Sequence, residues 1–176
     1  MKTTGRFIMV LKKFVLAIVL SFTMIGSALA QSPPSLIKQF SAWGAYSYSA
    51  ANSKVCYVLS LPTRKQPDGV NHGDIFFLIS QRPGQNISYE PQAKMGYTLQ
   101  EGSKVTVTVD GRNFTLFTQN DSAWVENAAE EPSLVAAMRA GSNMTVNAIS
   151  RRGTKTSYTY SLSGVTAALD EIKNCR

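Results

Sequence analysis

The chain has 176 residues, 44% of them hydrophobic, which is typical of one globular domain with an ordinary buried core. Its formal net charge is +7, but four of its eighteen Lys and Arg residues lie in the first thirteen positions, whereas all eleven acidic residues lie after position 30. Without that segment, fourteen cations face eleven acids, a balance of +3. This balance is too small to argue for nucleic acid, and it implies at most a weak attraction to anionic surfaces.

The first thirty residues have the three parts of a cleavable secretory signal peptide. A basic head precedes an apolar run of twelve residues at 14–25, and Ala-Leu-Ala at 28–30 is a small-x-small cleavage site. A transmembrane anchor is the alternative, but a bilayer span needs about 20 apolar residues. We therefore predict a signal peptide over residues 1–30 and a mature chain that begins at Gln31. Its location would be the periplasm or the cell exterior, with no membrane span after cleavage.

The two cysteines, Cys56 and Cys175, both lie in the mature chain. An even number of cysteines in an oxidising compartment favours a disulfide over two free thiols. A nucleophilic or metal-binding role fits less well, because neither cysteine has a nearby His or second Cys at ligand spacing. The bridge would span 119 positions and, in the chain-entropy model, stabilise the fold by roughly 4–5 kcal/mol less any strain.

The mature chain is expected to begin with a flexible leader over residues 31–40, which contains Ser and a Pro-Pro pair. Short strand-like segments bounded by turn residues follow, and this pattern is typical of an all-β sandwich or barrel. Segments 43–48 and 55–61 are the first two expected strands. A loop over residues 62–74 precedes the continuous apolar run 75–79, which we predict to be a strand covered on both faces.

The strongest local evidence for this fold class lies in residues 104–118. Asp110-Gly111 separates two alternating segments and has the composition of a two-residue hairpin turn. That loop length pairs Val107 with Phe114, whereas a slip of one residue would place Val opposite Asn or Thr. Turn chemistry and hydrophobic pattern therefore predict the same hairpin.

A second hairpin is expected around residues 150–154. A three-residue loop of Arg-Arg-Gly at 151–153 pairs Val146 with Tyr158, whereas a two-residue loop would place Val146 opposite Thr159. The three-residue form requires Gly153 in the left-handed region. We therefore expect Gly153→Val to be costly, because a β-branched residue resists positive φ.

Two short helices are predicted among the strands. The internal helix has Pro132 near its start and Gly141 just past its end. Its apolar face comprises Leu134, Val135 and Met138. The C-terminal helix is expected to begin near Ser163 as a cap, with apolar residues at i, i+3, i+4 and i+7, namely Val165, Ala168, Leu169 and Ile172. Cys175 follows at the same spacing, so a disulfide would dock this helix on the sheet.

His72 is the only histidine, and it lies in the 62–74 loop between Asp68 and Asp74. The arrangement superficially resembles a triad, but it fails the EF-hand pattern because Val70 occupies a ligand position. Asp and Gly residues in such loops usually shape turns. The mature chain carries no sequence motif for a catalytic nucleophile, phosphate loop, zinc site or dinucleotide, and we expect no cofactor.

A hydrolase that uses His72 or scattered carboxylates remains the alternative, since paired acids need leave no sequence signature. The candidate acids are Glu90, Glu101, Asp121 and Glu126.

A basic cluster of Arg151, Arg152 and Lys155 lies at the tip of the second hairpin, and Arg64 and Lys65 lie in the earlier loop. Such a cluster suits the phosphate groups of an anionic surface. A hydrated turn that is kept soluble by its charge is the alternative, because exposed hairpin tips are normally polar.

The order of several motifs along the mature chain matches a known family. The motifs include Gly96-Tyr97-Thr98-Leu99, Val109-Asp110-Gly111, Phe114-Thr115-Leu116-Phe117, Asp121-Ser122-Ala123-Trp124, Leu134-Val135-Ala136-Ala137-Met138 and Ser150-Arg151-Arg152-Gly153-Thr154. In this order they resemble the invasion-associated locus B family of Gram-negative bacteria. The resemblance implies an exported, immunoglobulin-like β-sandwich in the periplasm or at the cell surface, in a family named for host-cell entry and without agreed catalytic residues.

We therefore predict an exported non-enzymatic protein with one β-sandwich domain over residues 41–176. It would bind a protein or an anionic cell-surface component through the 62–74 loop or the Arg151, Arg152 and Lys155 tip. A periplasmic hydrolase is the alternative, which a pocket with converging Asp, Glu or His side chains would favour. A structural envelope component is a third possibility.

Overall fold

A computed structural model describes residues 33–50 and 53–175, so the signal peptide predicted over residues 1–30 lies outside the described residues. Eleven antiparallel strands form one continuous sheet, and two short α-helices accompany it. All residues of the buried hydrophobic cluster lie between Trp43 and Cys175. The all-β, sandwich-like fold class with one internal and one C-terminal helix is confirmed.

The strands follow one another in the sheet in the order β1-β2-β3-β5-β6-β9-β8-β7-β10-β11-β4. Their bounds are β1 Ser35–Phe40, β2 Trp43–Ala50, β3 Ser53–Ser60, β4 Arg64–Gln66, β5 Phe76–Arg82, β6 Ile87–Lys94, β7 Lys104–Val109, β8 Arg112–Gln119, β9 Ser122–Val125, β10 Asn143–Ile149 and β11 Lys155–Ser161. The helices are α1 Glu131–Ala140 and α2 Val165–Glu171, and short 3-10 turns occupy Pro83–Gln85, Ala128–Glu130 and Ile172–Asn174.

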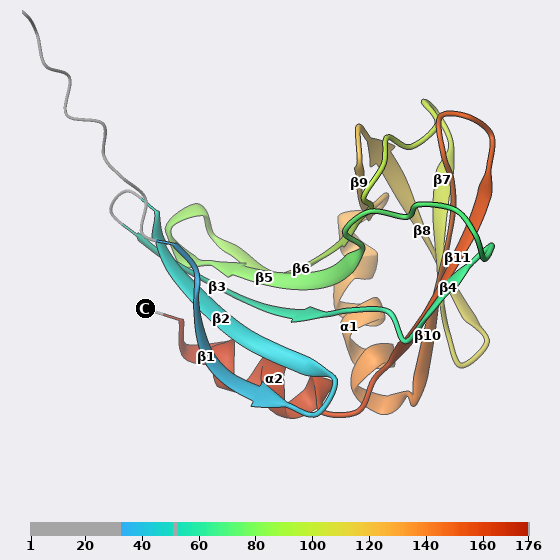
Figure 1. Cartoon of the computed structure of the whole chain (residues 1–176). Coiled ribbons are helices and arrows are strands. Elements are labelled where there is room, and N and C mark those ends of the chain that lie inside the picture. Colours follow the sequence, from blue (N-terminus) through green and yellow to red (C-terminus); the bar gives the residue numbers. More distant parts are fainter. Residues whose placement is uncertain (1–32, 51–52, 176) are drawn as a thin grey trace, which may run out of the picture. The chain divides into compact units, whose positions relative to one another are not determined.

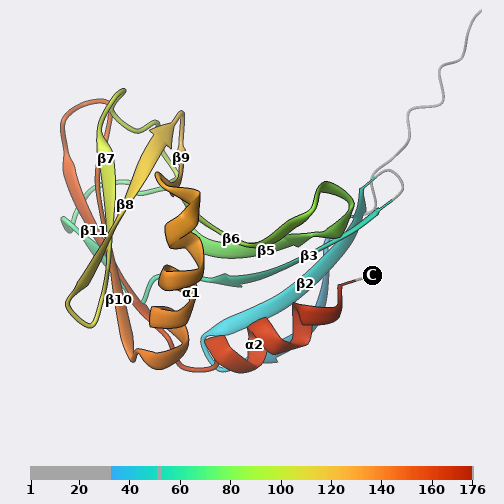
Figure 2. The ribbon, with the colours of Figure 1, turned by 180° about the vertical axis from the view of Figure 1, so that it is seen from behind.

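The sheet bends between β6 and β9, and this bend gives the sandwich-like arrangement its two halves (Figure 1). The first half comprises β1, β2, β3, β5 and β6, and the second half comprises β9, β8, β7, β10, β11 and β4. Helix α1 packs against β6, and α2 packs against β1, β2 and β3 (Figure 2). Both helices therefore cover strands of the first half.

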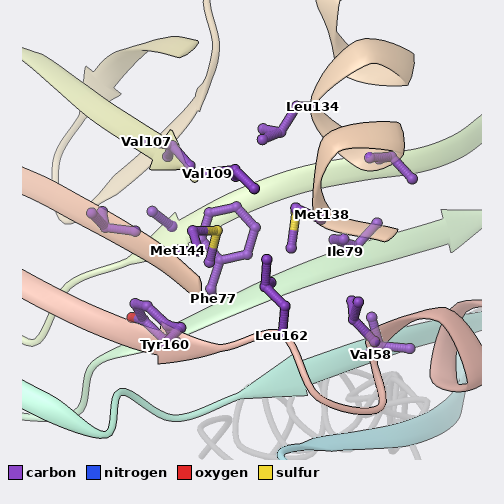
Figure 3. Close-up of a cluster of buried hydrophobic side chains, with 14 of the residues drawn as sticks. Val58, Phe77, Ile79, Val107, Val109, Leu134, Met138, Met144, Tyr160 and Leu162 are labelled. Carbon is purple, nitrogen blue, oxygen red and sulfur yellow. The ribbon is translucent and has the colours of Figure 1, made fainter. Parts of the chain in front are cut away.

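The core lies where the two halves and α1 face one another (Figure 3). The side chains drawn there come from β3, β5, β7, β10, β11 and α1, and they include Val58, Phe77, Ile79, Val107, Leu134, Met138, Met144 and Tyr160. Successive residues of a strand point to opposite faces, so every second residue of β7, β10 and β11 is buried. Phe77 and Tyr160 contact each other edge to face, with ring centroids 6.2 Å apart.

The hairpin predicted over residues 104–118 is confirmed. Strands β7 and β8 pair Val107 with Phe114, and Val109 is opposite Arg112. Asp110 and Gly111 have φ values of 42° and 89°, which a two-residue hairpin turn requires at both central positions.

The three-residue form of the second hairpin is also confirmed. Val146 lies opposite Tyr158, and the backbone amide of Ser150 donates to the carbonyl of Thr154 at 2.9 Å. Gly153 has a φ of 84°, and a Cβ at that position would meet no atom within 4 Å. Backbone conformation alone therefore explains the need for glycine there.

Both predicted helices form, and glycines flank them at the end of α1 and the start of α2. Gly141 follows α1 in an extended conformation, and a Cβ there would lie 2.7 Å from Cγ1 of Val109, so close packing rather than positive φ favours glycine. Helix α2 begins after Gly164, and no side chain caps it, so the expected cap by Ser163 is wrong. Gly164 has a φ of 90°, and its Cβ would lie 2.0 Å from the carbonyl oxygen of Phe40.

Three segments differ from the sequence-based expectation. Ser35–Phe40, expected within a flexible leader over residues 31–40, forms edge strand β1 and pairs with β2. Arg64–Gln66 in the expected loop forms β4, which pairs with β11. The run 75–79 is not covered on both faces, because Phe76 and Leu78 are only half-buried. Strand β4 depends on a partner that is distant in sequence, whereas β1 pairs with the next strand along the chain but is exposed, so it lacks an alternating pattern.

The predicted disulfide between Cys56 and Cys175 is present, with the two Cα atoms 5.8 Å apart. It joins β3 to the segment after α2, and both cysteines are buried. The C-terminal helix is therefore attached to the first half of the sheet by a covalent bond.

Replacing both cysteines, Cys56→Ser with Cys175→Ser, should lower the free energy of unfolding by roughly 2–5 kcal/mol, because the unfolded chain regains the entropy of an open loop. Urea denaturation followed by circular dichroism measures this change. Mass spectrometry of the non-reduced parent should show two hydrogens fewer than two thiols require, and labelling of both cysteines by a thiol reagent would contradict the bridge.

Gly153→Ala and Gly164→Ala form a matched pair of substitutions at positive φ. We expect about 1–2 kcal/mol of destabilisation at each position from the left-handed backbone. Gly164→Ala should cost a further ~1–3 kcal/mol because its methyl group would overlap the Phe40 carbonyl. The difference between their urea midpoints measures the steric part, and equal midpoints would contradict the close approach of Gly164 to β1.

Candidate functional site

A polar cavity of about 450 Å³, here called the tip cavity, lies beside the loop of the β10–β11 hairpin. Three segments that are distant in sequence form its wall: the loop before β5, the residues around Thr98, and the hairpin loop itself. Its lining residues are Val70, Asn71, His72, Tyr97, Thr98, Ser150, Arg151, Arg152, Thr154 and Thr156. The two loops that sequence reasoning offered as alternative partner surfaces therefore meet in one site.

The hairpin loop that carries Arg151 and Arg152 is fixed by backbone contacts. The amide of Arg151 donates to the carbonyl of Thr98 at 2.9 Å, and Leu99 forms an isolated β-bridge with Ser150. Within the loop, the amide of Gly153 donates to the carbonyl of Ser150 at 2.8 Å. Both arginines begin from an ordered backbone, so less conformational entropy is lost when their side chains bind.

Arg151 and Arg152 are exposed, and neither forms an ion pair with a carboxylate within residues 33–50 and 53–175. Lys155, predicted to belong to the same cluster, instead lines a different cavity of about 610 Å³ together with Lys104 and Gln66. The predicted three-residue basic cluster is thus divided between two cavities. Only its two arginines face the tip cavity.

Arg64 and Lys65, from the predicted earlier loop, lie on β4 beside Thr159 and Tyr158 of β11. The Lys65 ammonium lies 3.5 Å from the carbonyl oxygen of Gly73. Neither residue is part of the tip-cavity wall, but β4 brings the following loop, with His72, next to β11.

His72 is nine-tenths buried and forms one end of a chain of hydrogen bonds. Its Nε2 lies 3.0 Å from the Pro67 carbonyl, and its Nδ1 lies 2.9 Å from the Tyr158 hydroxyl. The Tyr158 hydroxyl contacts that of Tyr97 at 3.0 Å, and Tyr97 contacts Oγ1 of Thr156 at 2.6 Å. Three of these side chains, His72, Tyr97 and Thr156, line the tip cavity.

The two buried tyrosines of β11 differ in hydrogen bonding. Burial and the contact with Tyr97 hold the pKa of Tyr158 above its usual value, so its phenol stays protonated. Burial likewise raises the pKa of Tyr160. The Tyr160 hydroxyl, however, has no hydrogen-bond partner in the described part of the chain.

Three of the four candidate hydrolytic carboxylates form ion pairs with different cations. Glu90 pairs with Arg82 and Glu126 pairs with Lys104. The Asp121 carboxylate lies 2.6 Å from the Lys94 ammonium, and that contact lowers its pKa. The fourth candidate, Glu101, is exposed in a turn.

The described residues contain no group of three or more His, Cys, Asp or Glu side chains that could hold a metal ion. No acidic residue lines the tip cavity among the residues described there. The arrangement suits binding of an anion better than acid–base catalysis.

The outer face of the first half carries an aromatic surface that sequence reasoning missed. Tyr46 and Tyr57 stack with ring centroids 5.2 Å apart, and Tyr48 meets Tyr57 edge to face. Burial, together with the two neighbouring tyrosines, raises the pKa of Tyr57. Two of its tyrosines, Tyr48 and Tyr57, line a cavity of about 520 Å³ with Leu59, Phe76 and Leu78. Tyr46 and Tyr48 lie two positions apart on β2, as do Tyr57 and Leu59 on β3. This spacing places each pair on one face of the sheet, and it was the sequence signal for this surface.

A family model described as invasion associated locus B (IalB) protein matches residues 43–173. The chain belongs to the invasion-associated locus B family. The match runs from the first residue of β2 to the turn after α2, and it therefore includes all the segments that line the tip cavity. No curated protein and no solved structure matches the chain.

The invasion-associated locus B family is an exported bacterial protein family, and it is not a known enzyme family. Among the described residues of this family member, no helix has the length and apolar character needed to cross a membrane.

In this family member, Tyr158→Phe and Tyr160→Phe remove the same atom from neighbouring inward positions of β11. Tyr158→Phe should lower the free energy of unfolding by about 1–3 kcal/mol, because His72 and Tyr97 lose a buried partner. Tyr160→Phe should be neutral or stabilising, because its hydroxyl is buried without a partner. Urea titrations of the two variants measure their free energies of unfolding. A greater loss of stability for Tyr160→Phe than for Tyr158→Phe would contradict the hydrogen-bond chain.

Proposed function

We propose that this invasion-associated locus B protein is an exported, non-enzymatic binding module that holds phosphate groups of an anionic envelope or cell surface at its tip cavity. The observation that carries the proposal is the pair Arg151 and Arg152, which line the cavity from a fixed loop without a described carboxylate partner. A guanidinium group matches the geometry of phosphate oxygens and often binds them through two parallel hydrogen bonds.

The electrostatics of the cavity support an anionic ligand. Its described lining contains two permanent positive charges, a histidine and several neutral polar groups, but no acidic side chain. Unpaired like charges repel each other, and an anion placed between them removes that repulsion. Loops at the end of a rigid sandwich are also the usual position of binding residues in such folds.

The distribution of acids supports binding over hydrolysis. Glycoside-type chemistry needs two carboxyl groups that flank one scissile bond and lie about 5–10 Å apart. Glu90, Asp121 and Glu126 are instead each paired with a separate cation, and none of them lines the tip cavity. His72 contacts Pro67 and Tyr158 through its two ring nitrogens, and neither contact is with a carboxylate that could orient it as in a catalytic triad.

Export is supported by the disulfide and by the family. Cys56 and Cys175 are joined, and such bonds form and persist in oxidising compartments. The predicted signal peptide over residues 1–30 remains part of this proposal, as does the choice between periplasm and cell exterior.

Vesicle binding tests the proposed function. The chain 31–176, which contains the whole described core, should bind phosphatidylglycerol vesicles and not phosphatidylcholine vesicles, and added salt should weaken the binding. Arg151→Ala with Arg152→Ala should reduce the affinity by about tenfold or more, since each basic residue near an anionic membrane contributes about 1 kcal/mol. Co-sedimentation measures the bound fraction.

A charge-matched control separates site binding from net charge. Lys38→Ala with Lys54→Ala removes the same two charges from exposed positions on β1 and β3, in the first half of the sheet. This variant should bind nearly as well as the parent chain. Equal losses in both double variants would contradict a specific role for the tip cavity.

A further inference from the structure

We propose that His72 makes the tip cavity a pH-dependent site for a doubly charged tetrahedral oxyanion, such as a phosphate monoester or sulfate, with tighter binding when the imidazole is protonated. This inference rests on the proposed function because it concerns the ligand and regulation of the same cavity. Histidine is the side chain whose charge ordinarily changes between about pH 5 and 8.

The contact with Pro67 identifies the nitrogen that titrates. A carbonyl oxygen only accepts hydrogen bonds, so Nε2 of His72, 3.0 Å from the Pro67 carbonyl oxygen, carries a hydrogen in both charge states. Proton gain and loss therefore take place at Nδ1. That nitrogen faces the Tyr158 hydroxyl at 2.9 Å.

The protonated state satisfies the whole hydrogen-bond chain in one direction. With a hydrogen on Nδ1, the imidazolium donates to Tyr158, Tyr158 donates to Tyr97, and Tyr97 donates to Thr156. The Thr156 hydroxyl then donates to the Ala148 carbonyl at 3.3 Å. A charge buried beside polar groups is tolerated when its hydrogens and those of its partners all find acceptors, and here they do.

The neutral state breaks this chain at one contact. Nδ1 then only accepts, so the single hydroxyl hydrogen of Tyr158 is donated to Nδ1, and the hydrogen bond in which Tyr158 donates to Tyr97 is lost. The hydrogen bond between Tyr97 and Thr156 and the one from Thr156 to the Ala148 carbonyl remain. The two charge states therefore differ by one hydrogen bond, and protonation adds one positive charge to the cavity wall.

The charged neighbours of His72 couple this proton to an anion. Burial keeps Tyr158 neutral, and the cations nearby are Arg151 and Arg152 on the same cavity and Lys65 on β4, beside the Gly73 carbonyl. A dianion bound in this cavity would attract an imidazolium on the same cavity wall.

Two carboxylates lie on the histidine's own loop, Asp68 and Asp74. Both are exposed, and the described hydrogen bonds of the imidazole go to Pro67 and Tyr158 instead. Proton and anion are therefore expected to bind cooperatively, and thermodynamic linkage requires each to strengthen the other equally.

The single histidine allows a direct measurement, because an untagged chain 31–176 has one imidazole signal in its proton NMR spectrum. Sulfate is the probe, since it stays doubly charged throughout the titration. Saturating sulfate should raise the pKa of His72 by about one unit, and sulfate should bind about tenfold more tightly near pH 5.5 than near pH 8. Phosphatidylglycerol vesicles in a second arm test whether a lipid headgroup is held in the same way.

Three variants separate the possible causes. His72→Gln keeps hydrogen-bonding capacity without a titratable charge, and it should bind sulfate weakly and independently of pH. Arg151→Ala with Arg152→Ala should abolish the sulfate-induced shift, whereas Lys38→Ala with Lys54→Ala should retain it.

The failure of this inference is distinguishable from failure of the proposed function. If the arginine-dependent binding of sulfate or vesicles is present but the pKa of His72 does not move, the pH dependence is overturned and the proposed function stands. A pH effect seen with vesicles but not with sulfate likewise overturns it, because the effect then belongs to the membrane surface. If neither probe binds at any pH, the proposed function and this inference both fail.

Discussion

Tyr158 and Tyr160 lie two positions apart on β11 and therefore point to the same inward face of the sheet. The three-residue loop of the β10–β11 hairpin sets that register, because a two-residue loop would turn both rings outward. Val146 pairs with Tyr158 in the core, and the Tyr158 hydroxyl holds His72 at the cavity wall. The core of the sandwich and the candidate site thus depend on the same strand register, which Gly153 makes possible through its positive φ.

Local patterns predicted those parts of the fold whose partners are close in sequence. Alternation on both sides of Asp110-Gly111 and of the 151–153 loop was sufficient for two hairpins, because the turn fixes the register of the strands it joins. Strands β1 and β4 were not predicted. Both are exposed strands at the two edges of the sheet: β1 pairs with the following strand β2, and β4 pairs with β11 more than ninety positions later. Because neither strand alternates between buried and exposed residues, neither leaves a periodic signal in the sequence.

In the candidate site too, sequence patterns did not reveal contacts between segments that are distant in sequence. Arg151 and Arg152 were identified from sequence, and they do face a cavity. Lys155, the first residue of β11, does not join them and lines a different cavity with Lys104. His72 was judged a turn residue by its surroundings in sequence. Its contact with Tyr158 spans 86 positions and becomes evident only when β4 is placed beside β11. Residues that are close in sequence were therefore predicted to form one basic cluster that the structure divides, and the hydrogen bond between His72 and Tyr158 was missed because these residues are far apart in sequence.

The polar network and the apolar core impose opposite demands on β11. Tyr160 satisfies the core demand alone, because its ring packs against Phe77 while its hydroxyl has no partner within the described chain. Tyr158 satisfies both demands, since its ring is fully buried and its hydroxyl joins two other groups. A phenylalanine would fill the space of either ring, so packing alone does not explain the hydroxyl at position 158. The contact with His72 does explain it, and it connects a group that can change its charge to the cavity lined by Arg151 and Arg152.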